Sequence, residues 1–249
     1  MLSNPWLIAI ALNSFLLAIA FLLPKKLLTP AGYFHAGILG VLVWGTLGWR
    51  GYGVVLFYFL IGSVVTRIGM AEKEARGIAE KRSGIRGPEN VWGSALSGAI
   101  CAVLSLFLGF PWQSLLVLGY VASFSTKLSD TTASEVGKAY GKSTFLITNL
   151  QSVPRGTEGA ISLEGTLAGL VASGVISLLA WALGLISLMG VVWCIIAAFV
   201  ATNLESLIGA TLQSQWEWLT NELVNVINTL IGALVAILLG WLWLNAGGA

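Results

Sequence analysis

The chain has 249 residues, of which 57% are hydrophobic and only 10% are charged, and its mean hydropathy is +0.87. A soluble domain carries about 25% charged residues, so this composition excludes an ordinary soluble globular protein. The net charge of +2 is too small to indicate a nucleic-acid partner. Cys101 and Cys194 each lie in an apolar run, which favours small buried side chains over a disulfide or a metal pair.

Apolar runs of membrane-spanning length recur along the chain. About twenty residues are needed to cross roughly 30 Å of hydrocarbon as a helix. Gly, Pro and polar clusters interrupt the runs. We therefore predict an all-α fold, a polytopic transmembrane helical bundle that forms one integral-membrane domain over residues 1–249, with about eight spans (seven to nine). The spans lie near 5–23, 33–49, 52–69, 91–109, 112–129, 162–183, 185–203 and 223–244.

The charged residues gather on one side of the membrane. Loops after odd-numbered spans hold 12 of the 13 basic residues, and Arg50 alone follows an even-numbered span. The positive-inside rule makes the basic side cytoplasmic, so both termini are predicted to lie on the opposite side. All 11 acidic residues share the cytoplasmic side or its helix ends. We therefore predict a catalytic cytoplasmic face built from segments 70–90, 127–166 and 203–228.

The polar string DTTASEVGKAYGKS begins at Asp130. If it is helical, Asp130, Ser134 and either Gly137 or Lys138 share one face, and Lys138 and Lys142 stack one turn apart. A carboxylate with nearby hydroxyls can hold Mg²⁺, and paired lysines beside glycine backbone suit a polyphosphate. Val136 occupies the place of the first P-loop glycine, which excludes that motif. A solvated loop between helices is the alternative.

A second polar string, PRGTEGAISLEGTLAG, begins at Pro154. It contains Arg155 and Glu158, and it places Glu164 at the start of the sixth span. A carboxylate at a helix N-terminus is electrostatically favourable, so capping alone would explain Glu164. Burying a charge near hydrocarbon costs roughly 2.5–3.5 kcal/mol, whereas a cap returns about 1 kcal/mol. The balance favours an added role, such as binding a metal or a nucleotide.

A stripe of asparagines marks the start of the last span. Asn221, Asn225 and Asn228 fall at i, i+4 and i+7, and therefore share one helix face. Hydrogen bonds between helices in a bilayer contribute about 0.6 kcal/mol on average, which hardly explains three aligned amides. The stripe favours a polar cavity over simple helix packing.

The charged loop 70–90 allows two interpretations. Glu72 and Arg76 are four residues apart, as on a solvated helix at the level of the headgroups. Alternatively, Lys73, Arg82 or Arg86 steers phosphates into a site.

Together these strings resemble the family of phytyl-phosphate kinases, over most of the chain. The wider superfamily of dolichol kinases, phytol kinases and phosphatidate cytidylyltransferases shows the pattern D-T-x-A-S-x-x-G-x-x-x-G-K, followed later by E-G-T-x-A-G. The present sequence matches it from Asp130 to Lys142 and from Glu164 to Gly169. The strings ESLIGATLQ, which begins at Glu205, and TNELVNVINT, which begins at Thr220, are similar to the phytyl-phosphate branch.

The resemblance implies a Mg²⁺-dependent kinase that uses CTP to convert phytyl phosphate into phytyl diphosphate for tocopherol synthesis. We expect Asp130, Glu164 and Glu205 to bind the metal, and Asp130, Lys138, Lys142 and Arg155 to act in catalysis. The expected nucleotide- and substrate-binding residues are Thr131, Ser134, Gly137, Gly141, Glu158, Gly165, Thr166, Asn221, Asn225 and Asn228. The resemblance further implies a bacterial source, specifically a cyanobacterium, and a location in the inner or the thylakoid membrane.

Other functions stay open. Within the superfamily, the chain could be a prenol kinase or a CTP-dependent cytidylyltransferase that acts on a lipid phosphate. In another class, it could be a membrane transporter, which would carry functional charge near the membrane midplane or on both faces. The expected partners are a prenyl phosphate, a nucleoside triphosphate and the membrane. The sequence leaves homo-oligomerisation undecided.

Overall fold

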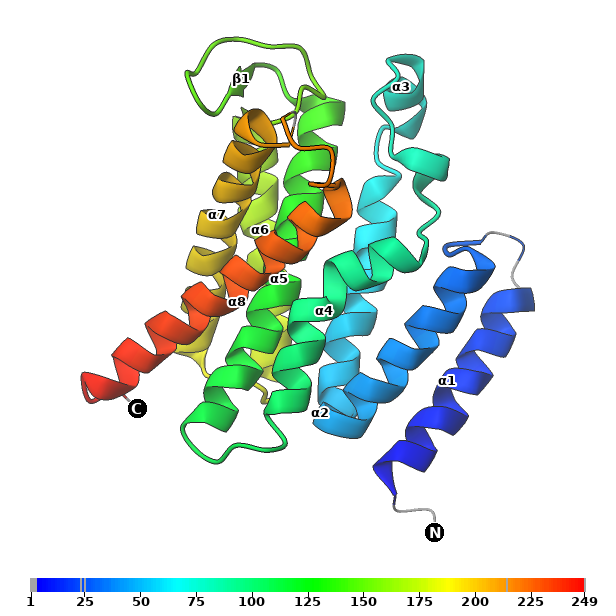
Figure 1. Ribbon diagram of the computed structural model, residues 1–249, viewed down its shortest axis with the longest axis vertical. Helices are drawn as coiled ribbons and strands as arrows, with labels where there is room; N and C mark the ends of the chain where they lie inside the picture. The colour runs from blue at the N-terminus through cyan, green and yellow to red at the C-terminus, as the bar shows by residue number, and fades with distance from the viewer. Residues whose placement is uncertain (1–3, 23, 25, 214, 249) are drawn as a thin grey trace.

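The computed structural model describes residues 4–22, 24, 26–213 and 215–248. Leu23 and Lys25, which belong to the first predicted span and its basic flank, lie outside the described residues. The fold is almost entirely helical, as predicted (Figure 1). The helices are α1 (Pro5–Leu22), α2 (Pro30–Thr66), α3 (Met70–Ala75), α4 (Pro88–Leu104), α5 (Trp112–Tyr140), α6 (Leu163–Ala182), α7 (Leu188–Thr211) and α8 (Asn221–Asn245), with a short 3₁₀ turn, η1 (Lys81–Gly84).

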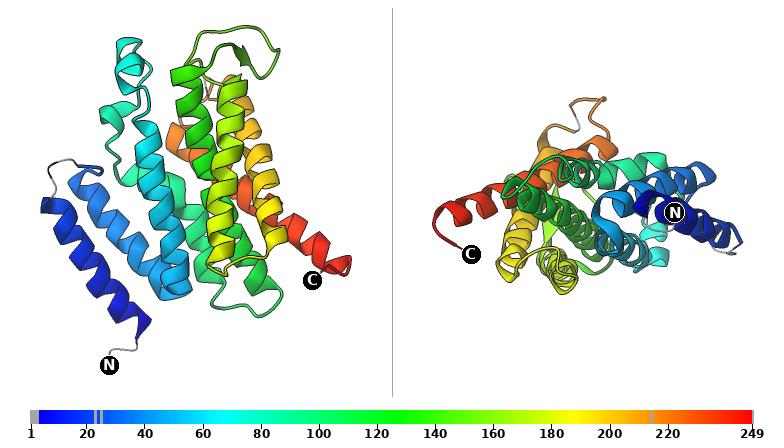
Figure 2. Two further views of the ribbon diagram at one scale, coloured as in Figure 1. Left: turned by 180° about the vertical axis from the view of Figure 1, so that it is seen from behind. Right: turned by 90° about the horizontal axis from the view of Figure 1, so that it is seen from below.

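Helix α2 contains two of the predicted spans. Its 37 residues would extend for about 55 Å as one straight helix, nearly twice the thickness of the hydrocarbon layer. Gly48 breaks the helix, because its φ of 64° and ψ of −161° lie outside the helical region and are accessible to glycine. The chain reverses there, so the two arms of α2 run side by side in opposite directions (Figures 1 and 2).

Each of the eight predicted spans falls on a helical segment. Within the described residues, five helices are long and apolar enough to cross a membrane, namely α1, α2, α6, α7 and α8. Helix α4 is shorter, at 17 residues, and α5 carries charged residues in its C-terminal half. Three predicted span ends were wrong: α4 ends at Leu104 instead of 109, α5 continues to Tyr140 instead of ending at 129, and α7 continues to Thr211 instead of ending at 203.

All the loops that carry the predicted catalytic segments lie at one end of the bundle. Helix α1 begins and α8 ends at the opposite end (Figures 1 and 2). The charged end also holds a small antiparallel sheet of β1 (Thr144–Leu146) and β2 (Ala160–Ser162), in which Thr144 pairs with Ser162. This sheet is the one departure from the all-α prediction in the described residues.

Helix α5 forms the centre of the bundle and contacts α2, α4, α6, α7 and α8. Its closest neighbour is α6, where small residues let the two backbones approach. A Cβ atom on Gly165 would lie 2.5 Å from the carbonyl oxygen of Ala133, and one on Gly169 would lie 2.9 Å from the Ser129 hydroxyl. These two glycines therefore let α6 pack closely on α5, and they bring the first turn of α6 against the polar part of α5.

Candidate functional site

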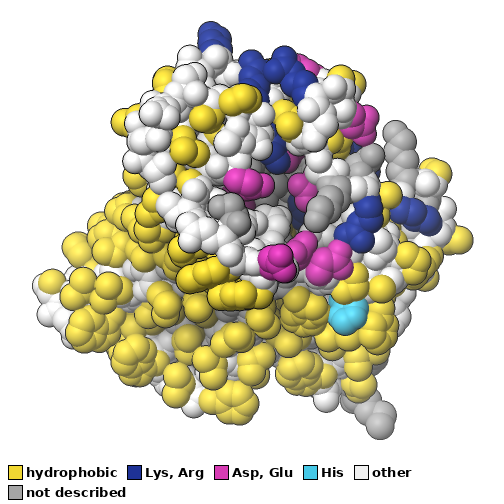
Figure 3. Space-filling view, turned by 45° about the horizontal axis from the view of Figure 1, so that its top comes forward, with side chains coloured by type: hydrophobic (Ala, Val, Ile, Leu, Met, Phe, Trp, Pro, Cys, Tyr) yellow, Lys and Arg dark blue, Asp and Glu magenta, His cyan; other side chains and the backbone are white. Residues whose placement is uncertain are grey.

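A polar cavity of about 980 Å³ opens at the charged end of the bundle. Residues from all three predicted catalytic segments line it, together with the second arm of α2 and the N-terminal turns of α4, α6 and α8. Figure 3 shows carboxylate side chains around the hollow, with a continuous apolar surface below it. The volume lies at the upper end of the range of about 300–1,000 Å³ that is usual for ligand pockets, so it can hold more than a small ion.

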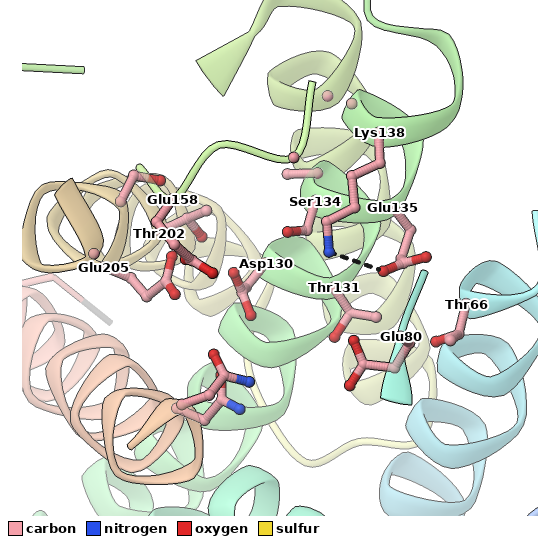
Figure 4. Close-up of a pocket in the computed structure, with 18 of the residues that line it drawn as sticks. Thr66, Glu80, Asp130, Thr131, Ser134, Glu135, Lys138, Glu158, Thr202 and Glu205 are labelled. Atoms are coloured by element: carbon pink, nitrogen blue, oxygen red, sulfur yellow. Dashed lines mark ion pairs between the residues drawn. The ribbon is translucent and has the colours of Figure 1, made fainter. Parts of the chain in front are cut away.

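One face of α5 forms the wall of the cavity. Asp130, Thr131, Ser134 and Lys138 all line it and lie along successive turns of the helix (Figure 4). This arrangement arises because α5 continues as a helix for about three turns beyond its predicted end. The structure thus places a carboxylate, two hydroxyls and an amine on one surface.

The carboxylate of Asp130 is held by a buried lysine that the sequence marked only as one of the basic residues of the cytoplasmic side. Lys127 Nζ donates hydrogen bonds to Asp130 Oδ2 and to Asn225 Oδ1, each at 2.6 Å. Lys127 and Asp130 are 7% and 8% exposed. This contact fixes the Asp130 side chain at the floor of the cavity and joins α5 to α8.

Two further carboxylates face Asp130 across the cavity. Glu205 projects from α7 and Glu158 from the loop before β2, and both point towards the space beside Asp130 (Figure 4). Gly159 brings this loop close to α7, because its φ is +74° and a Cβ atom there would lie 2.6 Å from the Ser206 carbonyl oxygen. Thr202 also lines this side, and its buried hydroxyl has no hydrogen-bond partner.

A second ion pair lies behind the mouth of the cavity. Lys73 on α3 donates to the Glu135 carboxylate on α5 and, at 2.8 Å, to the carbonyl oxygen of Thr66. Lys138 lies 3.6 Å from the other Glu135 oxygen and remains 24% exposed (Figure 4). Lys73 is therefore a structural cation that ties α3 to α5, whereas Lys138 can still reach a ligand.

The opposite wall is formed by the loop 77–90 and the second arm of α2. Arg86 lines the cavity there, with its guanidinium carbon 5.6 Å from the centre of the Tyr58 ring and Nη1 donating to the Tyr58 hydroxyl at 3.3 Å. Arg82 lines the same wall but forms an ion pair with Glu89. The two arginines thus differ, because Arg86 has no carboxylate partner among the described residues.

Carboxylates outnumber basic groups among the described residues that line the cavity. The acidic residues are Glu80, Glu89, Asp130, Glu135, Glu158, Glu205 and Glu222, and the basic ones are Arg82, Arg86, Lys127 and Lys138. No group of three or more His, Cys, Asp or Glu in the described residues could hold a metal ion on its own. Mg²⁺ is usually bound through one or two carboxylates and the phosphates of the substrate, so the donors fit an ion that is shared with a polyphosphate.

Several predicted residues do not line the cavity. Lys142 follows the end of α5 and is exposed, so it does not stack on Lys138 as expected. Arg155 donates to the Ala139 carbonyl oxygen at 3.0 Å and anchors the loop to α5. Glu164 lies in the first turn of α6, where the helix dipole stabilises its negative charge. Gly141 is buried beside Ser162.

The asparagine stripe is divided between two environments. Asn221 and Asn225 line the cavity, as expected for a polar pocket. Asn228 lies one turn deeper, is completely buried, and has no hydrogen-bond partner for either side-chain polar atom. The remaining predicted residues Thr131, Ser134, Gly137, Glu158, Gly165 and Thr166 all line the cavity.

Comparison with known proteins identifies the family. The model for "Integral membrane protein DUF92" matches residues 13–233. The membrane protein sll0875 of Synechocystis is 68% identical, over 95% of this chain and 92% of its own length. Protein VTE6, chloroplastic, of Arabidopsis thaliana is 45% identical over 95% of this chain and 72% of its own, and the membrane protein MJ0933 of Methanocaldococcus jannaschii is 31% identical over 94% and 95%. No solved structure matches. The chain therefore belongs to the DUF92 family of integral membrane proteins, which confirms the relationship indicated by its polar motifs.

Proposed function

We propose that the protein is a membrane phosphotransferase that adds the γ-phosphate of CTP to a prenyl monophosphate, with phytyl phosphate as the expected acceptor. The observation that carries this proposal is the cavity itself, where Asp130, Glu158 and Glu205 face one another beside Lys138 at the boundary of the apolar surface. The resemblance to phytyl-phosphate kinases supports the same function, as does the similarity to a chloroplast protein over 95% of the chain.

The excess of carboxylates in the cavity supports a requirement for a metal ion with this substrate. A nucleoside triphosphate would be repelled by the acidic wall if it entered as a free anion. Asp130 and Glu205 would hold a Mg²⁺ ion that the triphosphate brings with it, and the ion would neutralise phosphate charge during transfer. The hydroxyls of Thr131 and Ser134 lie on the same face of α5 as Asp130 and can donate to phosphate oxygens.

The chemistry needs little from the protein beyond positioning and charge neutralisation. An oxygen of the acceptor monophosphate attacks the γ-phosphorus and forms the new P–O bond of the diphosphate. The bond between the γ-phosphorus and the β,γ-bridging oxygen breaks, and its electron pair leaves with CDP. Lys138 is placed to neutralise the charge that develops on the phosphates. The acceptor oxygen is already ionised, so no histidine or other general base is needed.

The apolar side chains of the cavity lining suit the prenyl chain. Leu170 on α6 and Phe199 on α7 line the cavity, and Phe199 is 45% exposed. A chain that passed between these side chains would stay in hydrocarbon while its phosphate remained in the polar cavity. This arrangement supports an acceptor that is a lipid and not a soluble alcohol phosphate.

The alternatives differ in product. A cytidylyltransferase would use the same acidic cavity but would transfer CMP and release pyrophosphate. A prenol kinase would need a free alcohol as acceptor. A transporter is less well supported, because the charged side chains that line the cavity are gathered at one end of the bundle.

The test is to incubate the purified protein with phytyl phosphate, Mg²⁺ and CTP labelled on either the γ- or the α-phosphate. The proposal predicts γ-label, and no α-label, in the lipid product. Transfer of α-label would establish a cytidylyltransferase instead. Labelling of phytol but not of phytyl phosphate would establish a prenol kinase, and no labelled lipid from any prenyl phosphate would overturn the phosphotransferase.

A further inference from the structure

We propose that Arg86 binds the phosphate of the lipid acceptor, at a subsite separate from the one that binds the nucleotide. This inference rests on the proposed function, and it assigns the two substrates to opposite walls of one cavity. The wall formed by α5 and α7 carries the carboxylates Asp130, Glu158 and Glu205, which suit a metal-bound triphosphate. The opposite wall carries Arg86.

Arg86 is distinguished from the other cavity cations by its contacts. Lys127 is paired with Asp130, Lys138 lies 3.6 Å from Glu135, and Arg82 is paired with Glu89. Within the part of the chain that the structure describes, Arg86 forms no ion pair. One face of its guanidinium lies over the Tyr58 ring, and one N–H group donates to the Tyr58 hydroxyl. A guanidinium has five N–H donors in one plane, and among the described residues the only side-chain hydrogen bond of Arg86 is the one from Nη1 to Tyr58, so the other N–H groups can donate to phosphate oxygens.

The backbone holds Arg86 in place before any ligand arrives. The Arg86 carbonyl oxygen accepts from the Thr29 N–H at 3.0 Å, and the Arg86 N–H donates to the Leu27 carbonyl oxygen at 3.1 Å. Gly62 on α2 leaves space for the guanidinium, because a Cβ atom there would lie 3.0 Å from Arg86 Nη2. A side chain that is held in this way loses little entropy on binding.

The depth of the guanidinium matches a lipid phosphate. Gly62 and Tyr58 precede the last residue of α2, Thr66, by four and eight residues, so Arg86 reaches about 6–12 Å below the end of that helix. A soluble nucleotide enters from the mouth, whereas a lipid phosphate is carried at a depth set by its chain. Of the carboxylates on this side, Glu89 is held by Arg82, and Glu80 and Glu222 form no ion pair with Arg86 among the described residues.

The test uses Arg86→Gln, with Arg82→Gln as the matched control from the same wall. We expect Arg86→Gln to raise the KM for phytyl phosphate at least about tenfold while changing the KM for CTP less than about twofold. Arg82→Gln should change both constants less than about threefold, because the Arg82 charge is already neutralised by Glu89. An unchanged acceptor KM in Arg86→Gln, or a rise confined to CTP, would overturn the assignment.

Binding without nucleotide separates this inference from the proposed reaction. Binding of phytyl monophosphate to the purified wild-type protein should weaken at least about tenfold in Arg86→Gln, and phytol, which lacks the phosphate, should show no such difference. If the wild type transfers no phosphate but still binds the monophosphate through Arg86, the result supports the acceptor subsite and refutes the proposed kinase reaction. If Arg86→Gln does not fold, Arg86→Lys replaces it, because lysine keeps the charge but not the planar fork of donors. Arg86→Lys should bind phytyl monophosphate about three- to tenfold more weakly than the wild type. Equal affinity of Arg86→Lys and the wild type would then overturn the inference.

Discussion

Lys73 on α3 and Glu135 on α5 form an ion pair in which only 1% and 4% of the two side chains are exposed. The residues are 62 positions apart in the sequence, and Lys73 also donates to the end of α2 through the Thr66 carbonyl oxygen. This pair joins the segment 70–90 to the helix that carries Asp130. It therefore holds two walls of the cavity together.

Removing one member of this pair should destabilise the protein strongly. Lys73→Met leaves a buried carboxylate without its main partner, and we expect a loss of about 3–5 kcal/mol in the free energy of unfolding. The double variant Lys73→Met/Glu135→Leu should recover most of that loss, because neither charge remains buried. Unfolding can be followed in detergent micelles by circular dichroism.

The exposed pair Arg76–Glu72 provides the control. Its side chains are 50% and 45% exposed, so Arg76→Met should cost no more than about 1 kcal/mol. A Lys73→Met protein as stable as the Arg76→Met protein would contradict the role of the buried pair.

Much of the fold follows from patterns that are local in the sequence. Apolar runs located the helices, and the break expected at Arg50-Gly51 lies within a few residues of the reversal at Gly48. The end of α5 was misplaced because hydropathy falls at Lys127, where the chain becomes polar but remains helical. Tertiary contacts with α6 and α8 stabilise this polar continuation, and no local pattern records them.

The part of the site that depends on local sequence patterns was likewise predictable. Motif spacing located Asp130, Ser134 and Lys138 on one helix face, and the structure places all three on the cavity wall. The contact between Lys127 and Asn225 joins residues 98 positions apart, so it could not be read from the sequence. Lys142 was misjudged because its stacking on Lys138 required α5 to continue beyond Tyr140.

Two lysines of the same motif should differ in function. Lys138→Ala removes a cation from the cavity, and we expect it to raise the KM for CTP about tenfold or more or to lower kcat to a similar extent. Lys142→Ala changes an exposed side chain outside the cavity and should leave kcat/KM within about twofold of the wild-type value. Steady-state kinetics of both variants measure this difference, and equal losses would show that the cavity does not define the phosphate site.

Nucleotide binding should depend on a divalent cation. The described cavity side chains carry more carboxylates than basic groups, so EDTA should weaken CTP binding at least about tenfold by leaving the triphosphate opposed to Asp130 and Glu205. Added Mg²⁺ should restore binding. Equilibrium binding of labelled CTP to the purified protein measures the effect separately from catalysis, and equally tight binding in EDTA would exclude a shared ion.

Phe199 should influence the choice of acceptor chain. Phe199→Ala removes apolar surface from the cavity lining, and the KM for phytyl phosphate should rise about three- to tenfold. A short isoprenyl phosphate, which offers less apolar surface to this side chain, should be affected less. Phe107→Ala, at a 76% exposed position in the loop between α4 and α5 that does not line the cavity, provides the control and should change neither constant.

The most direct measurement compares γ-phosphate transfer to phytyl phosphate by the wild type, Asp130→Asn and Glu217→Gln. Glu217 is exposed and does not line the cavity, whereas Asp130 lies at its floor. Removal of the carboxylate charge at position 130 should lower kcat at least about 100-fold without unfolding the protein, and Glu217→Gln should retain the wild-type rate. Transfer by a folded Asp130→Asn protein at the wild-type rate would contradict the assignment of this cavity as the active site.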